Sequence, residues 1–97
     1  MIEQIPDFIK EKEDGTGVII TLHTGYLMIG TDTRLKEVEM REPMVKDQMA
    51  IRKISNDDVV REQSLLASLT GLTPAEFETM TARDYARVQA GYNFFMD

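Results

Sequence analysis

The stretch from Ser64 to Met96 reads SLLASLTGLTPAEFETMTARDYARVQAGYNFFM, and it decides the fold of the C-terminal part of the chain. Its leucines recur at helical spacing, and Gly71 is placed to close that helix in a left-handed conformation. Thr73-Pro74-Ala75-Glu76 is a strong helix start: the threonine caps, the proline takes the first helical position and the glutamate reaches back. Thr81–Asp84 repeats this pattern more weakly. The stretch therefore predicts three successive helices.

The last of these helices carries an apolar stripe. Its members recur at spacings of 3, 4 and 3 and are Tyr85, Val88, Tyr92 and Phe95. Phe94 lies about 100° around the helix from Phe95, outside that stripe. It either contacts a partner or packs back onto a sheet.

The end of this helix is the candidate partner-binding site. Gly91 weakens the helix by about 1 kcal/mol relative to alanine, which favours a frayed apolar end. Exposed apolar surface of this kind marks protein interaction sites. We therefore predict that the partner-binding residues are Tyr92, Phe94, Phe95 and Met96.

Residues 16–42 are predicted to form a small antiparallel sheet. Val18, Ile20 and Leu22 alternate with their neighbours, and β-branched residues are frequent. Thr24-Gly25 and Thr31-Asp32-Thr33 are turn clusters. A three-stranded meander is preferred over a two-stranded hairpin with a long loop. The last strand has Val38 and Met40 on a buried face and Glu37, Glu39 and Arg41 on a wet one.

The whole chain is predicted to be one α+β domain, 1–97, with two or three strands followed by about four helices. Residues 1–14 form an acidic N-terminal arm, in which a short helix from Pro6 and a loose arm remain open alternatives. Residues 44–96 form the helical part, which begins after Pro43 ends the last strand. Its first helix covers about Val45–Ile54, and Asp57-Asp58 opens the second.

Composition excludes several classes of function. The 97 residues carry a net charge of −6, and the basic residues are interleaved with acids, so nucleic-acid binding is not expected. The chain has no cysteine, which excludes disulfides and fits a reducing compartment. Its acidic start is not a signal peptide. The uncharged run Gly15–Gly30 is too short and too rich in turn residues for a membrane helix.

No residue pattern predicts catalysis, a cofactor or a metal. His23 is the only histidine, and the chain has no cysteine to partner it. The acid pair Glu37 and Glu39 lies on a solvated face, and the pair Asp57 and Asp58 serves a helix start. Gly15-Thr16-Gly17 lacks the lysine of a phosphate-binding loop. We therefore expect a protein that is not an enzyme.

The chain is rich in methionine. Of seven methionines, five lie in its body: Met28, Met40, Met44, Met49 and Met80. Methionine adapts its shape at promiscuous surfaces, and it also fills gaps in cores.

Several ordered motifs resemble the tail assembly chaperones of Mu-like and P2-like contractile-tailed phages and prophages. The junction Glu39–Met49 is similar to the family's passage from a strand through Arg-Glu-Pro into a helix. Leu69–Phe77 resembles its glycine turn before the third helix, Asp84–Gln89 its last helix and Ile19–Leu22 its first strand. The chain departs from the family pattern at Arg52-Lys53, where the resemblance implies a more acidic helix end.

The resemblance implies a non-enzymatic factor in virion morphogenesis. Such chaperones bind the long, hydrophobic and helical tape measure protein in the host cytoplasm, and they keep it soluble until the tail tube assembles. The expected partner is thus the tape measure protein, without nucleic acid or membrane, and self-association remains open. The alternatives are a structural tail completion or tube-end protein and an acidic regulatory module that binds a protein.

Overall fold

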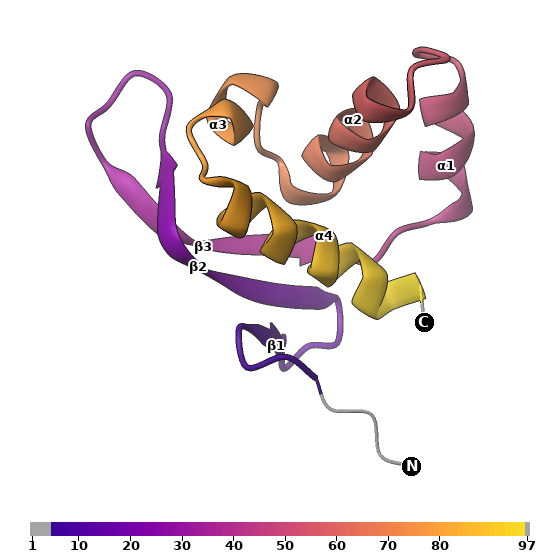
Figure 1. Ribbon diagram of the computed structural model, residues 1–97. Coiled ribbons are helices and arrows are strands. Elements are labelled where there is room, and N and C mark those ends of the chain that lie inside the picture. Colours follow the sequence, from indigo (N-terminus) through magenta and orange to yellow (C-terminus); the bar gives the residue numbers. More distant parts are fainter. Residues whose placement is uncertain (1–4, 97) are drawn as a thin grey trace.

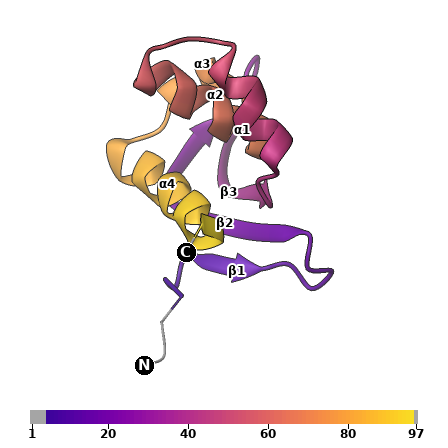
Figure 2. The same ribbon diagram turned by 90° about the vertical axis from the view of Figure 1, so that its right-hand side faces the viewer.

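The computed structural model describes residues 5–96, which form a sheet followed by helices, as the α+β prediction requires (Figure 1). The elements in chain order are β1 (Ile9–Glu11), β2 (Gly17–Leu27), β3 (Arg34–Arg41), α1 (Val45–Arg52), α2 (Asp58–Thr70), α3 (Pro74–Glu78) and α4 (Ala82–Met96). The sheet has the order β1-β2-β3, and both pairs are antiparallel. α4 lies across one face of the sheet, and the other three helices stand on the β3 side of α4 (Figures 1 and 2).

The sheet has three strands, but they are not the three that the sequence predicted. Thr24-Gly25 is not a turn, because β2 runs through it to Leu27. Between the pairs Thr21–Glu37 and Tyr26–Leu35, β2 has four residues where β3 has only Lys36, so the extra residues form a bulge. Gly25 has a φ of 98° within this bulge. Both turns and bulges often contain a glycine in a left-handed conformation. Thr24-Gly25 in the sequence therefore does not show which of the two forms.

The first strand lies inside the predicted acidic arm. Ile9 is buried opposite Ile20, and the three residues of β1 pair with Val18–Ile20. Neither a helix from Pro6 nor a loose arm describes this segment. The part of the arm formed by residues 1–4 lies outside the described residues. A strand of three residues with one buried side chain has no periodicity that a sequence pattern would detect.

The predicted helix boundaries are confirmed at most positions. Asp57 caps α2 through bonds from Val59 N and Val60 N, and Gly71 closes the helix with a φ of 77°. Thr73 and Glu76 form the reciprocal capping box at the start of α3. α1 ends at Arg52, two residues before the predicted end. The capping residues recognised in the sequence therefore do begin and end these helices.

The core lies between α4, α2 and the inner face of the sheet. Its buried members include Val18, Ile20, Leu22, Val38, Met40, Leu66, Leu69, Phe77 and Val88. The alternation predicted for the last strand is confirmed, since Val38 and Met40 are buried and their charged neighbours Glu37, Glu39 and Arg41 are exposed. Within residues 5–96, no helix covers the opposite face of the sheet (Figure 2).

Gly91 brings α4 close to the sheet. A β-carbon at this position would overlap Cδ1 of Ile20, so the absence of a side chain permits the close packing. The helix continues without a break to Met96. The predicted fraying at Gly91 is therefore wrong, because helix propensity is outweighed here by tertiary packing.

Side chains from α3, the turn after it and α4 cover backbone N–H groups of β2 and of the loop that follows it. The carboxylate of Asp84 accepts hydrogen bonds from the backbone N–H groups of His23, Thr24 and Gly25 at 2.6, 2.9 and 2.8 Å. Thr79 Oγ1 accepts from Leu27 N at 2.9 Å, and Glu76 Oε2 accepts from Ile29 N at 3.3 Å. Such covering of a strand edge satisfies groups that otherwise invite pairing with another chain.

Candidate functional site

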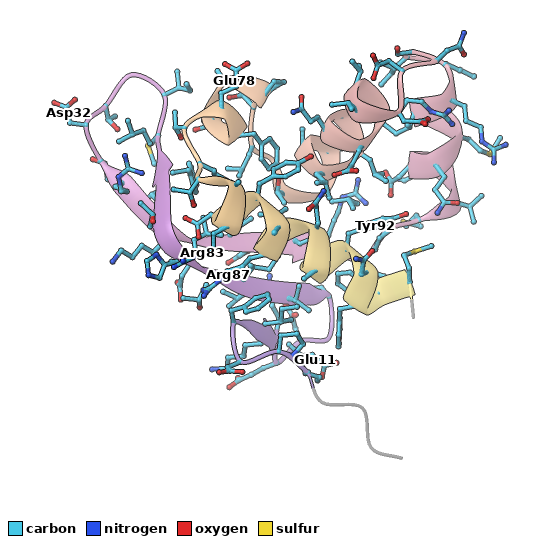
Figure 3. The ribbon with its side chains drawn as sticks, in the orientation of Figure 1. Glu11, Asp32, Glu78, Arg83, Arg87 and Tyr92 are labelled. Atoms are coloured by element: carbon cyan, nitrogen blue, oxygen red, sulfur yellow. The ribbon has the colours of Figure 1, made fainter. Side chains whose placement is uncertain are left out.

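The predicted partner-binding residues occupy the last two turns of α4 but point to different surroundings. Tyr92 projects toward the side of α1 and α2 (Figure 3), where it lines two adjoining hollows. Phe94 and Phe95 line a hollow beside the turn between β1 and β2. Met96 is 51% exposed. The predicted set is thus divided between two surfaces that flank the same helix.

The hollow beside Phe94 and Phe95 is here named the hairpin hollow. It is lined by Glu11, Lys12, Gly15, Gly17, Val18, Glu42, Phe94 and Phe95. The two phenylalanine rings meet edge to face with their centroids 5.6 Å apart. Both are half-buried against the core, including Phe94, for which packing onto the sheet was one of two expectations. Each ring therefore stabilises the fold and still presents an edge to this hollow.

The two hollows beside Tyr92 share Glu62, Leu65 and Tyr92, and together they form a surface named here the helical groove. It runs between α1, α2 and α4. Its remaining lining residues are Gln48, Ile51, Arg52, Arg61, Leu66, Gln89 and Asn93. The volumes of the two hollows are about 320 and 440 Å³. An apolar floor with a polar rim is the composition expected of a protein-binding groove.

The acidic group of the helical groove is already hydrogen-bonded within the protein. Glu62 Oε1 accepts from Tyr85 Oη at 3.0 Å and from Gln89 Nε2 at 2.5 Å. Burial, followed by the hydrogen bond to the Glu62 carboxylate, raises the pKa of Tyr85 to about 12. The phenol therefore stays protonated at neutral pH and keeps donating to Glu62.

The methionines divide between the core and the surface. Met40 is 1% exposed and Met80 packs against the core, whereas Met28, Met44 and Met49 are 40%, 55% and 60% exposed.

The sequence analysis missed the exposed aliphatic residues around α1 and the start of α2. They are Val45, Ile54, Val59 and Val60, and Val45 is 73% exposed. A sequence signal for them existed: the apolar residues from Met44 to Ile54 point around the whole circumference of α1, and one small helix buries only one side.

The histidine and the acid pairs considered for chemistry lie apart from these hollows. His23 is exposed at the bulge in β2, where its Nδ1 lies 3.3 Å from Thr24 Oγ1. Asp57 caps α2, and Glu37 and Glu39 are exposed on β3. In the part of the chain that the structure describes, no group of three or more His, Asp or Glu residues is arranged to hold a metal ion. None of the helices in residues 5–96 has the length and apolar character needed to cross a membrane.

The fold defines a small two-layer α+β domain with apolar hollows on both sides of its last helix. Residues 19–97 match the family described as "Phage tail assembly chaperone proteins, E, or 41 or 14", so the chain belongs to this phage tail assembly chaperone family. The match begins inside β2 and spans the bulge, β3 and all four helices. Searches of curated proteins and of solved structures gave no match. The family resemblance drawn from the sequence motifs is confirmed.

Proposed function

We propose that this chain binds the tape measure protein of its phage or prophage and keeps it soluble during tail morphogenesis. The observation that carries the proposal is the apolar surface at the end of α4, where Met96 is 51% exposed and Phe94 and Phe95 line an open hollow. A helical, hydrophobic partner needs such apolar surface to cover its own.

The rest of the chain supports this role. Its net charge of −6 favours a complex that remains in solution. Binding through this surface requires no catalytic group. We propose that the protein works by binding alone, in the host cytoplasm. The sites proposed for the partner are Tyr92, Phe94, Phe95 and Met96.

Co-expression tests the proposal directly. The chain and the tape measure protein of the same tail operon are produced together, and the soluble fraction of the tape measure protein is measured. We expect it to rise several-fold with the chain present. Equal aggregation with and without the chain would refute the proposal.

A matched pair of variants tests the site. Phe95→Ser/Met96→Ser removes apolar surface from the end of α4, and we expect it to reduce the soluble tape measure protein by at least about half. Met28→Ser/Ile29→Ser makes the same kind of change in the β2–β3 loop, where these side chains are 40% and 55% exposed, and it should have little effect. Met96→Ser alone controls for any loss of packing by Phe95.

Mass spectrometry of purified virions separates a chaperone from a structural tail protein. A chaperone that leaves before the particle is complete is missing from the virion. Stoichiometric recovery of the chain from virions would favour a completion or tube-end protein instead.

A further inference from the structure

The helical groove is lined in part by a segment of the chain in which acidic and basic residues balance. Residues 44–62 contain four Lys or Arg and four Asp or Glu, so the rest of the chain carries the whole net charge of −6. The basic residues are Lys46, Arg52, Lys53 and Arg61. Arg52 and Arg61 line the groove itself.

Three of the four carboxylates in this segment are occupied within the protein. Asp47 accepts from both Nη atoms of Arg41, each at 2.8 Å, and from the backbone N–H of Met44. Asp57 caps the start of α2. Glu62 accepts from the side chains of α4 described above. Asp47 is thus paired with Arg41, whereas Asp57 and Glu62 each engage neighbouring groups of the protein through one oxygen.

The two arginines of the groove are free by comparison. Among residues 5–96, Arg52 makes no ion pair, and Arg61 has only a 3.8 Å contact with Asp58, whose side chain is 99% exposed. Such an exposed pair at the limit of contact contributes little. The groove thus presents two guanidinium groups above the apolar floor formed by Ile51, Leu65 and Leu66.

The apolar surface continues past the groove onto α1. Val45 and Met49 are four residues apart and are 73% and 60% exposed. Residues at this spacing share a helix face, and Met49 lies three residues before the groove residue Arg52, at a spacing that also places neighbours on one side of a helix. Val45 and Met49 thus add exposed apolar surface to α1, the helix that supplies Gln48, Ile51 and Arg52 to the groove.

We propose that the helical groove binds an amphipathic helix of the tape measure protein that carries carboxylates beside its apolar stripe. Arg52 and Arg61 pair with those carboxylates, while Tyr92, Leu65 and Ile51 contact the stripe. This inference rests on the proposed function and adds the chemistry of the partner segment and the face that receives it. Complementary charge sets orientation and suppresses partner helices whose apolar stripe is flanked by basic side chains.

Peptides that tile the helical part of the tape measure protein provide the probe. Their binding is measured by fluorescence anisotropy to the full chain, to Arg52→Glu/Arg61→Glu and to the control Lys10→Glu/Lys36→Glu. Both variants change the net charge equally, and Lys10 and Lys36 are exposed on the sheet. We expect the acidic amphipathic peptides to bind best. The groove variant should weaken them about tenfold and the control less than about twofold.

Salt and charge exchange sharpen this test. Binding to the unmodified chain should weaken as NaCl rises, and the groove variant should lose that dependence. Glu→Lys changes in the best peptide should restore binding to the groove variant, as a double-mutant cycle requires. Circular dichroism and the urea midpoint establish that each variant is folded.

The outcomes separate the inference from the function it rests on. Equal weakening by both double variants, with the tape measure protein still kept soluble, overturns the groove assignment and leaves the chaperone function intact. Absence of any peptide binding together with aggregation of the tape measure protein refutes both. A change in the sedimentation of the chain alone in Arg52→Glu/Arg61→Glu would assign the groove to contacts between copies, and it would also overturn the inference.

Discussion

The two ends of the helical layer are built on opposite principles. At the α3–α4 corner, the side chains of Glu76, Thr79 and Asp84 bind backbone N–H groups of β2 and the loop after it, and Asp84 is fully buried. At the α1 end, Val45 and Met49 face solvent. At the corner, polar side chains bind the protein's own backbone. On α1, apolar side chains are exposed to solvent. The difference indicates which region defines the fold and which is available to a partner.

Removing Asp84 should have the largest effect. Asp84→Ala leaves three backbone N–H groups at the bulge without their acceptor, and we expect a loss of about 4 kcal/mol in the free energy of unfolding. Domains of this size have a total of about 5–15 kcal/mol, so the variant loses a large fraction of its stability. Urea denaturation measures the change.

Asp14→Ala is the matched control for Asp84. Asp14 also accepts bonds from a nearby backbone N–H and from a hydroxyl, both of Thr16, but it lies in an exposed turn. Its variant should unfold at nearly the same urea concentration as the unmodified chain. Equal shifts for the two variants would contradict the special role of the corner.

Filling the space at Gly91 should come next. Gly91→Leu forces a side chain into the contact with Ile20 and Met40, and overpacking of this kind costs about 3 kcal/mol. Thermal unfolding measures the loss. Ala90→Leu, one position earlier and half-buried, is the control and should cost less. A stabilised Gly91→Leu variant would show that the end of α4 is not held against the sheet.

The corner should also make stability sensitive to acid. Burial raises the pKa of Asp84, but the N–H groups of Gly25, His23 and Thr24 outweigh it and hold the pKa below its ordinary value. The backbone N–H of Thr73 is the main cause that lowers the pKa of Glu76, and Arg41 lowers that of Asp47. All three groups bind fewer protons when folded. Their stabilisation is therefore complete above about pH 5 and is lost as the pH falls through their folded pKa values.

Urea midpoints at about pH 7, 5 and 3 check this dependence. We expect a decline between pH 5 and 3, and a shallower decline in Asp84→Asn, which has no carboxylate to protonate. If the urea midpoints of the unmodified chain and of Asp84→Asn fall equally with pH, Asp84 does not cause the sensitivity to acid.

The smallest effect on stability is expected at α1. Met49→Ser replaces a side chain that is 60% exposed, and the free energy of unfolding should change by no more than about 0.5 kcal/mol. Binding of the tape measure peptides should nevertheless weaken, because apolar contact is lost. A large loss of stability without a loss of binding would reverse the comparison between the two regions.

Local signals in the sequence predicted much of the fold. The capping box at Thr73, the left-handed cap at Gly71 and the alternation around Val38 and Met40 each depend on neighbours within a few residues. The continuous β2, the short β1 and the packing of Gly91 depend on contacts distant in the sequence, and a single sequence does not display those. Thr81–Asp84 was interpreted as a helix start, which it is, since Asp84 N donates to Thr81 Oγ1. No pattern in the sequence indicates that the Asp84 carboxylate binds the backbone of β2.

The candidate site was predicted only in part. The aromatic end of α4 follows from its crowding of apolar residues, and Tyr92, Phe94 and Phe95 do line hollows. The other walls of those hollows come from α1, α2 and the β1–β2 turn, which are far from α4 in the sequence. Their meeting is a result of the tertiary fold alone.

The bonds of Asp84 also constrain the order in which the chain folds. They join residues 59 to 61 positions apart in the sequence. The C-terminal half of β2 therefore leaves the ribosome long before the acceptor, Asp84, has been synthesised. Contacts of such long range slow folding and leave strand edges open while they wait. The nascent sheet therefore stays incomplete until α4 has been synthesised. A member of the tail assembly chaperone family with this architecture therefore passes through an aggregation-prone stage of its own before its sheet is complete.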